Sequence, residues 1–151
     1  MQQWATLGGG SFKTAAQREQ ANNDGRKTYQ ATEKDIAVSN VLEKIAKEKD
    51  TLVTSVALAY ILHKAPYTYP IVGGRTVQHI RGNIAALKLK LSVEEIEEIE
   101  DAVPFDHGFP LNFLFMGQKN PSRRGEDVFL TKMEVHLETV DRVKAIAPRE
   151  G

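Results

Sequence analysis

Two segments in the first half of the chain have the hydrophobic pattern of core helices. The first begins at Thr32, which has the capping-box spacing with Asp35. The apolar positions that follow recur at helical spacing and predict one buried stripe: Val38, Val41, Leu42, Ile45 and Ala46. The second segment, Val53 to about Lys64, is apolar on almost every side, so we expect it to be deeply buried before Pro66 stops it.

A strand, a glycine turn and a third helix are predicted next. Residues 67–72 are short, aromatic and β-branched, which favours a strand, and Gly73 and Gly74 close it. Thr76 is a good N-cap for the helix that follows. The stripe that this helix is expected to bury consists of Val77, Ile80, Ile84 and Leu87.

The fourth predicted helix begins at a second capping box, formed by Ser92 and Glu95. Its apolar positions are Val93, Ile96, Ile99 and Val103, and Pro104 stops it. Residues 104–151 are expected to form an irregular tail with several aromatic side chains. Within the tail, residues 133–138 alternate between apolar and polar in a pattern that fits either a strand or a helix.

The beginning of the chain carries a weaker pattern. Residues 4–7 precede three glycines, which predicts the end of a strand running into a turn. Residues 11–32 are polar and predict a long loop with one helical turn near residues 14–20. A loop of that length is uncommon in a compact domain unless it covers a site.

Composition and charge narrow the classes of partner. The chain has 151 residues, the size of a single domain, and its 20 Lys and Arg balance 20 Asp and Glu. This zero net charge argues against nucleic acid or an anionic membrane as partner. Because there is no cysteine, thiolate catalysis and sulfur-based zinc sites are excluded, and we expect no metal site. The longest apolar run, Val53–Leu62, is about half a membrane span, and residues 1–10 lack signal-peptide features, so we expect a cytoplasmic protein.

The glycine turn before the third helix is where the sequence indicates chemistry. Such turns present backbone N–H groups at the positive end of a helix, which suits a phosphate, and Arg75 adds a fork of donors. His79 and Asn83 follow at steps of four on one face, and Gly82 leaves room for a flat group. Together these residues would suit an adenosine that carries a phosphate. They also fit ordinary turn chemistry and a solvated helix face, and the three-glycine dinucleotide fingerprint is absent.

Four stretches of the sequence resemble one enzyme family. Residues 69–87 (YPIVGGRTVQHIRGNIAAL) are similar to the eighth βα unit of the aldo-keto reductases, in the fungal branch of aryl-alcohol dehydrogenases and norsolorinic acid reductase-like enzymes. Residues 91–100 (LSVEEIEEIE) and 103–110 (VPFDHGFP) continue the resemblance. Residues 4–10 (WATLGGG) look like the end of the family's seventh barrel strand.

The resemblance implies an α/β fold, the (β/α)8 barrel, which in this family has about 300 residues or more. Residues 1–151 would then be a partial oxidoreductase domain: the carboxyl-terminal fragment of a barrel, about its last two βα units, mostly helical, with the tail 104–151. The family's catalytic Asp, Tyr, Lys and His lie on early strands. Since none has a counterpart here, we assign no catalytic residue.

The resemblance also implies NADP as the cofactor, with an aldehyde, ketone or alcohol as substrate. In the family, the aromatic at the position of Trp4 stacks on the nicotinamide, and the position of Leu7 lines the cofactor channel. The adenosine and its 2′-phosphate are held by the positions of Gly73, Gly74, Arg75, His79, Gly82 and Asn83. Arg75 favours NADP over NAD.

Departures from the family leave an alternative function open. Ala5, Val72 and Gly82 stand where serine, proline and glutamate are usual, and the missing glutamate removes the usual latch over the adenine edge. The alternative is a catalytically inactive truncated product that acts as a nucleotide-binding or protein-interaction module. Because a partial barrel exposes strand edges and apolar faces, we expect loose packing and self-association.

Overall fold

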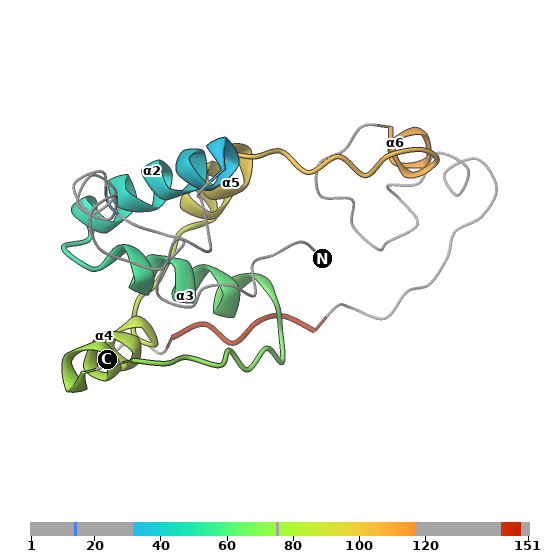
Figure 1. The fold of residues 1–151 in the computed structure, drawn as a ribbon. Coiled ribbons are helices and arrows are strands. Elements are labelled where there is room, and N and C mark those ends of the chain that lie inside the picture. The colour runs from blue at the N-terminus through green and yellow to red at the C-terminus, as the bar shows by residue number, and fades with distance from the viewer. Residues whose placement is uncertain (1–13, 15–31, 75, 117–142, 149–151) are drawn as a thin grey trace. The chain divides into compact units, whose positions relative to one another are not determined.

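The computed structural model describes residues 14, 32–74, 76–116 and 143–148, and its regular elements within them are helices (Figure 1). They are α2 (Glu33–Glu48), α3 (Val53–Lys64), α4 (Val77–Ala86), α5 (Val93–Asp101) and α6 (Leu111–Leu114). The chain divides into two compact units, Met1–Val103 with Ala145–Gly151, and Pro104–Lys144. Helices α2 to α5 belong to the first unit, and α6 belongs to the second.

Local hydrogen bonds define both ends of α2. The Thr32 backbone N–H donates to the Asp35 carboxylate over 2.8 Å, and the Asp35 N–H donates to the Thr32 hydroxyl over 3.3 Å, so the predicted capping box is confirmed. At the other end Asp50 has a φ of 49°, and the Thr51 N–H donates to the Ala46 carbonyl over 2.9 Å. This is the Schellman arrangement, with aspartate where glycine is usual.

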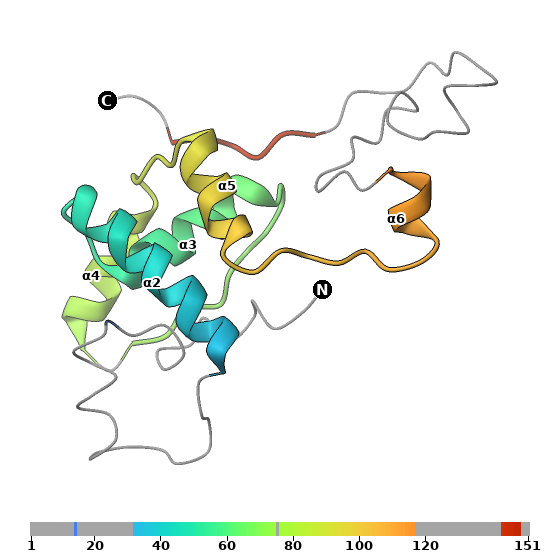
Figure 2. The same ribbon diagram turned by 90° about the horizontal axis from the view of Figure 1, so that it is seen from above.

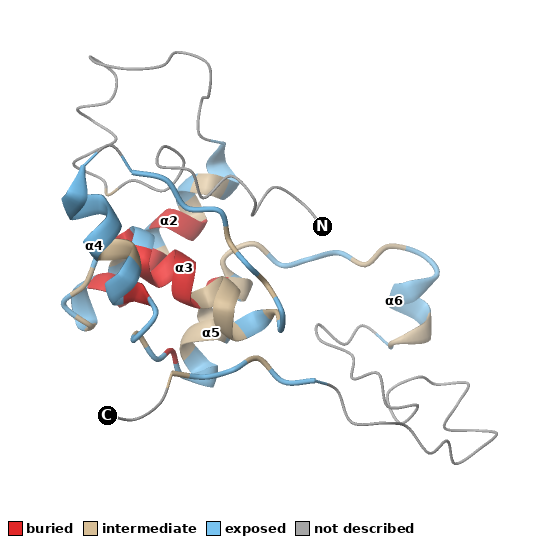
Figure 3. Cartoon of the chain, turned by 90° about the horizontal axis from the view of Figure 1, so that it is seen from below, coloured by how far each residue is buried: buried red, intermediate tan, exposed pale blue. Residues whose placement is uncertain are grey.

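The core of the first unit lies where α2, α3 and α5 meet (Figures 2 and 3). The apolar side chains buried there are those of Val38, Leu42, Ile45, Ala46, Val53, Val56, Ala57, Ala59, Leu91 and Ile99. The α2 stripe is therefore confirmed, with Val41 packed at its margin. Burial of α3 is confirmed for its first half, whereas residues 60–63 are only half-buried.

Helix α5 also begins as predicted, and charge holds it to its neighbours. The Ser92 N–H donates to the Glu95 carboxylate over 2.7 Å, and the Glu95 N–H donates to the Ser92 hydroxyl over 3.2 Å. The helix ends at Asp101, three residues before Pro104, and Val93 is exposed rather than packed. Three ion pairs join it to α2 and α3: Lys44–Glu98 at 2.7 Å, Lys49–Glu95 at 2.9 Å and Lys64–Glu100 at 2.5 Å.

The predicted buried stripe of α4 is wrong. Its four residues are each more than half exposed: Val77, Ile80, Ile84 and Leu87. The side of α4 that packs on α3 instead carries small residues, with Ala86 buried to 2% exposure and Gly82 close to Leu52. An apolar stripe is buried only where a matching surface exists, and the described residues provide none on that side of α4.

The strand predicted for residues 67–72 is not formed. A strand needs a neighbour to satisfy its backbone N–H and C=O groups, and no described segment pairs with this one. Its alternate side chains are consequently exposed, with Tyr67, Tyr69 and Ile71 at 73%, 85% and 102%. The segment keeps an irregular course from α3 to α4 (Figure 1).

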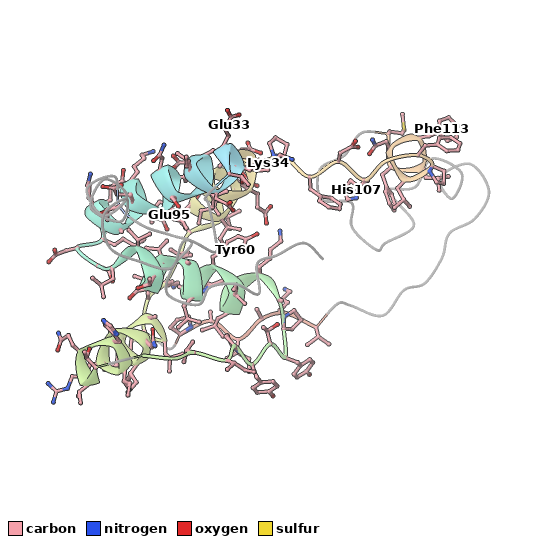
Figure 4. All side chains as sticks on the ribbon, viewed as in Figure 1. Glu33, Lys34, Tyr60, Glu95, His107 and Phe113 are labelled. Carbon is pink, nitrogen blue, oxygen red and sulfur yellow. The ribbon has the colours of Figure 1, made fainter. Side chains whose placement is uncertain are left out.

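The described part of the second unit contains a short turn built around Asp106. Its carboxylate accepts from the Gly108 N–H over 2.9 Å and from the Asn112 amide over 2.6 Å, just before α6 begins. The rings of Phe105 and His107 meet edge to face with their centroids 5.0 Å apart (Figure 4 labels His107). The four-residue α6 was not expected from the sequence.

Some predictions concern other parts of the chain. The strand end at residues 4–7, the helical turn near residues 14–20 and the alternating stretch 133–138 lie outside the described residues, apart from residue 14. Within the residues that are described, no helix has the length and apolar character needed to cross a membrane.

Candidate functional site

The glycine turn and the start of α4 form the candidate site. Gly73 and Gly74 are exposed and lead into Thr76, whose hydroxyl accepts a hydrogen bond from the His79 N–H over 3.3 Å. Thr76 therefore caps α4 as predicted. The amino end of α4 lies at the surface, where the helix dipole is positive.

The two glycines serve different purposes. A Cβ on Gly74 would lie 2.7 Å from the Cβ of His79, so the turn folds back on the helix closely enough to require glycine there. A Cβ on Gly73 would meet nothing within 4 Å. Space is thus open beside the exposed Gly73, whereas Gly74 lies close against His79.

His79 and Asn83 lie one turn apart on α4. His79 is exposed and Asn83 is half-buried, and helical spacing puts both beside Gly82, which faces Ser55 and Leu52. Gly82 lies between them, and its carbonyl oxygen accepts from the buried Ser55 hydroxyl over 3.3 Å. A Cβ on Gly82 would meet Leu52 Cδ1 at 3.1 Å, so α3 fills the space that the sequence predicted for a flat group on that side.

The stretch of sequence that includes this turn carries charge of one sign. Residues 51–93 contain no Asp or Glu, although they contain Lys64, Arg75, Arg81, Lys88 and Lys90. The zero net charge of the chain therefore conceals a basic stretch, which the six acidic residues of α5 balance. A basic stretch of sequence at the amino end of a helix favours an anionic ligand.

The structure brings part of the predicted site together. Gly73, Gly74, His79, Gly82 and Asn83 all lie on this turn and helix. The other predicted residues, Trp4, Leu7 and Arg75, lie outside the described residues. Sequence reasoning missed the contacts of α4 with Ser55 in α3 and with Leu52, the residue just before α3, because no local spacing links residues so far apart in the chain.

Two further polar side chains, Tyr60 and His63, make contacts at the other end of α3. The Tyr60 hydroxyl donates to Glu100 over 3.1 Å, and burial raises the pKa of Tyr60, with the Glu100 carboxylate raising it further (Figure 4). The His63 ring lies 2.7 Å from the Ala59 carbonyl and 3.4 Å from the Leu91 N–H. A donor at Nδ1 and an acceptor at Nε2 satisfy both contacts. Tyr60 thus links α3 to α5, and His63 links α3 to the segment that precedes α5.

Comparison with known proteins identifies the family of this chain and several similar proteins. Residues 1–104 match the model of the aldo/keto reductase family. Norsolorinic acid reductase B of Dothistroma septosporum is 49% identical over 152 aligned residues, covering 96% of this chain and 39% of the relative. Norsolorinic acid reductase A of Aspergillus parasiticus is 43% identical over 151 aligned residues, which cover 98% of this chain and 38% of the relative. A putative aryl-alcohol dehydrogenase of Saccharomyces cerevisiae is 40% identical over 118 aligned residues, which cover 74% of this chain and 78% of the relative.

The chain thus spans about two fifths of the length of the two reductases named above. No solved structure matches it. The resemblance identified from the sequence is confirmed by the family match and by the names of these relatives.

Proposed function

Since this chain belongs to the aldo/keto reductase family, an oxidoreductase family, we propose that it supplies the cofactor-adenosine end of an NADP-dependent enzyme of aryl-alcohol dehydrogenase type. The observation that carries the proposal is the basic glycine turn leading into α4, which lies inside the matched residues 1–104. The barrel that the family implies would include these helices. We also propose a cytoplasmic location, because the sequence has no apolar run of membrane-spanning length and residues 1–10 lack signal-peptide features.

The described residues fit a phosphate-bearing nucleotide in two respects. Open backbone at Gly73 and the exposed amino end of α4 offer N–H donors to a phosphate. Residues 51–93 contribute basic side chains and no carboxylate, which favours an anion. In the proposal, Arg75 binds the 2′-phosphate beside this turn, and His79 and Asn83 face the adenosine.

The reactive end of the cofactor is assigned through the family resemblance. Trp4 would stack on the nicotinamide and Leu7 would line its channel. NADP supplies or accepts the hydride that interconverts an aldehyde or ketone with its alcohol. General acid catalysis needs a donor within hydrogen-bond reach of the carbonyl, and no residue here takes that role. We therefore expect purified chain to oxidise NADPH with an aromatic aldehyde no faster than buffer does.

Calorimetric titration of the purified chain with NADP and with NAD tests the cofactor assignment. A charge-assisted contact is worth about 1.5–3 kcal/mol, so Arg75→Ala should weaken NADP binding about tenfold to a hundredfold and leave NAD binding almost unchanged. Arg81→Ala is the matched control, because it removes the same charge from the exposed surface of α4. Equal affinity of the unaltered chain for both nucleotides would refute the assignment.

The interaction-module alternative has less support, because the relatives named above are reductases and dehydrogenases. We also propose that the chain self-associates, through the exposed apolar side chains of residues 67–71. Tyr67, Tyr69 and Ile71 are exposed on a segment that no described strand pairs with. Exposed apolar side chains on backbone that no strand pairs with favour contact with another chain.

A further inference from the structure

The contact between α3 and α4 is made at a glycine. Ser55, 3% exposed, donates its hydroxyl to the Gly82 carbonyl oxygen over 3.3 Å. The Leu52 side chain lies on the same side of Gly82, where a Cβ would come within 3.1 Å of Leu52 Cδ1. One turn further along α4, the small side chain of Ala86 is buried. These residues let the backbone of α4 approach the amino end of α3 closely.

A glycine inside a helix requires a reason. It destabilises a helix interior by about 1 kcal/mol relative to alanine. At Gly82 a methyl group would come within 3.1 Å of Leu52 Cδ1, so the end of that side chain would have to shift by a few tenths of an ångström. The glycine therefore serves helix packing, on the side of the helix where the sequence predicted space for a ligand.

The same contact orients the two polar side chains of the candidate site. His79 lies three residues before Gly82 and Asn83 lies directly after it. The opposite side of α4 is exposed, so the packing on α3 sets the rotation of α4 about its own axis within the described residues. A small rotation at Gly82 would move His79 and Asn83 together.

We propose that Ser55 is a positioning residue for the cofactor site, acting through Gly82 to fix the direction in which α4 presents His79 and Asn83. This inference rests on the proposed function, because it concerns the adenosine end of the same site. Ser55 itself does not contact the ligand. Loss of its hydroxyl leaves the site residues in place and changes their orientation.

The test measures affinity and orientation separately in the full-length chain. The affinity probe is 2′,5′-ADP, which carries the adenosine and the 2′-phosphate without the nicotinamide. The orientation probe is the nuclear magnetic resonance signal of the His79 ring and of the Asn83 side-chain amide, without ligand. Ser55→Ala should weaken 2′,5′-ADP binding about two- to fivefold, the effect of one modest hydrogen bond, and should shift both signals.

A rescue distinguishes positioning from a general loss of stability. Gly82→Ala adds a methyl group that crowds Leu52 Cδ1 at the contact between α4 and the start of α3. If that contact sets the direction of His79 and Asn83, the variant should weaken probe binding as Ser55→Ala does, although alanine favours the helix. Leu52→Ala in that background should restore binding, and Leu52 is 57% exposed, so trimming it costs little packing. Ser39→Ala is the matched control, because Ser39 is equally buried but lies on α2. It should leave affinity and both signals unchanged.

The outcomes separate this inference from the proposed function. If the unaltered chain does not bind 2′,5′-ADP, the proposed function fails and the positioning role fails with it. If the unaltered chain binds, and Ser55→Ala and Gly82→Ala bind equally well with unshifted signals, only the positioning role is overturned. An effect of Ser39→Ala as large as that of Ser55→Ala would also overturn it, because it would mark a general structural loss.

Discussion

The Tyr60 hydroxyl links α3 to α5, and Tyr60→Phe removes that link without removing the ring. The hydroxyl donates to Glu100 Oε1 over 3.1 Å, and Lys64 Nζ lies 2.5 Å from the same oxygen. The ring packs at the margin of the core, where phenylalanine can occupy the same space. The substitution therefore isolates one hydrogen bond to a carboxylate that keeps its lysine partner.

The expected cost follows from the kind of bond lost. A hydrogen bond to a charged group contributes about 1.5–3 kcal/mol. Because this cluster is only partly buried and Lys64 still pairs with Glu100, we expect the low end, about 1.5 kcal/mol. That is about a tenfold change in the ratio of folded to unfolded chain. Urea unfolding at neutral pH, followed by far-ultraviolet circular dichroism, measures it.

The same contact predicts a pH dependence with a definite sign. Burial first, and then the Glu100 carboxylate, raises the pKa of Tyr60 above its ordinary value. A folded-state pKa above the unfolded one favours the protonated folded form, so this stability is fully present below about pH 10. It is lost as the pH rises from there towards the raised pKa. The unaltered chain should therefore lose stability through this group above about pH 10, and Tyr60→Phe should lack that loss.

Tyrosinate absorbance during alkaline titration provides the second measurement. Tyr60→Phe should abolish a late step in the absorbance and leave the earlier rise intact. Tyr69→Phe is the matched control, since it deletes the same hydroxyl from a side chain that is 85% exposed, and it should leave the late step unchanged. If Tyr60→Phe lowers the rise near pH 10 instead, and the unfolding free energy does not change, the contact between α3 and α5 is refuted.

Three further predictions concern other contacts. Asp50 has a left-handed φ at the end of α2, which suits glycine better than aspartate. Asp50→Gly should therefore raise the free energy of unfolding, measured with urea, by up to about 1 kcal/mol. A loss of stability would contradict this. Hydrogen bonds from the Asn112 amide and then the Gly108 N–H lower the pKa of Asp106, so the turn is stabilised at higher pH and weakened as the pH falls through that lowered pKa. Asn112→Ala should raise the Asp106 pKa in a magnetic resonance titration, and an unchanged titration would disprove the contact. Ile71→Lys should reduce self-association in sedimentation measurements, and equal association of both chains would exclude this segment as the interface.

Elements decided by local chemistry could be predicted from the sequence. The capping boxes at Thr32 and Ser92 join residues three apart, and both form as expected. The stripe of α2 was also predicted correctly, because its partner surfaces on α3 and α5 are present. The end of α2 was not predicted, because Asp50 occupies a position where glycine is the usual signal.

Elements decided by distant partners could not be predicted in this way. Residues 67–72 have the composition of a strand, but composition supplies no neighbour, and the described residues contain no pairing partner for them. The stripe of α4 has the right spacing, yet spacing does not state which surface will cover it. Periodicity identifies a side of a helix that can be buried, and the remainder of the fold decides whether it is.

Helix α4 shows how this limit extends to the candidate site. Its packing on α3 is set by Gly82 and Ala86, which leave no hydrophobic signal in the sequence because their contribution is small size. His79 and Asn83 lie beside those small residues, so the contacts that hold α4 and the contacts proposed for the cofactor occupy adjacent strips of one helix. A substitution on either strip therefore acts on both stability and binding. Only variants that divide the two effects, such as Leu52→Ala in the Gly82→Ala background, can assign a residue on α4 to the ligand rather than to the fold.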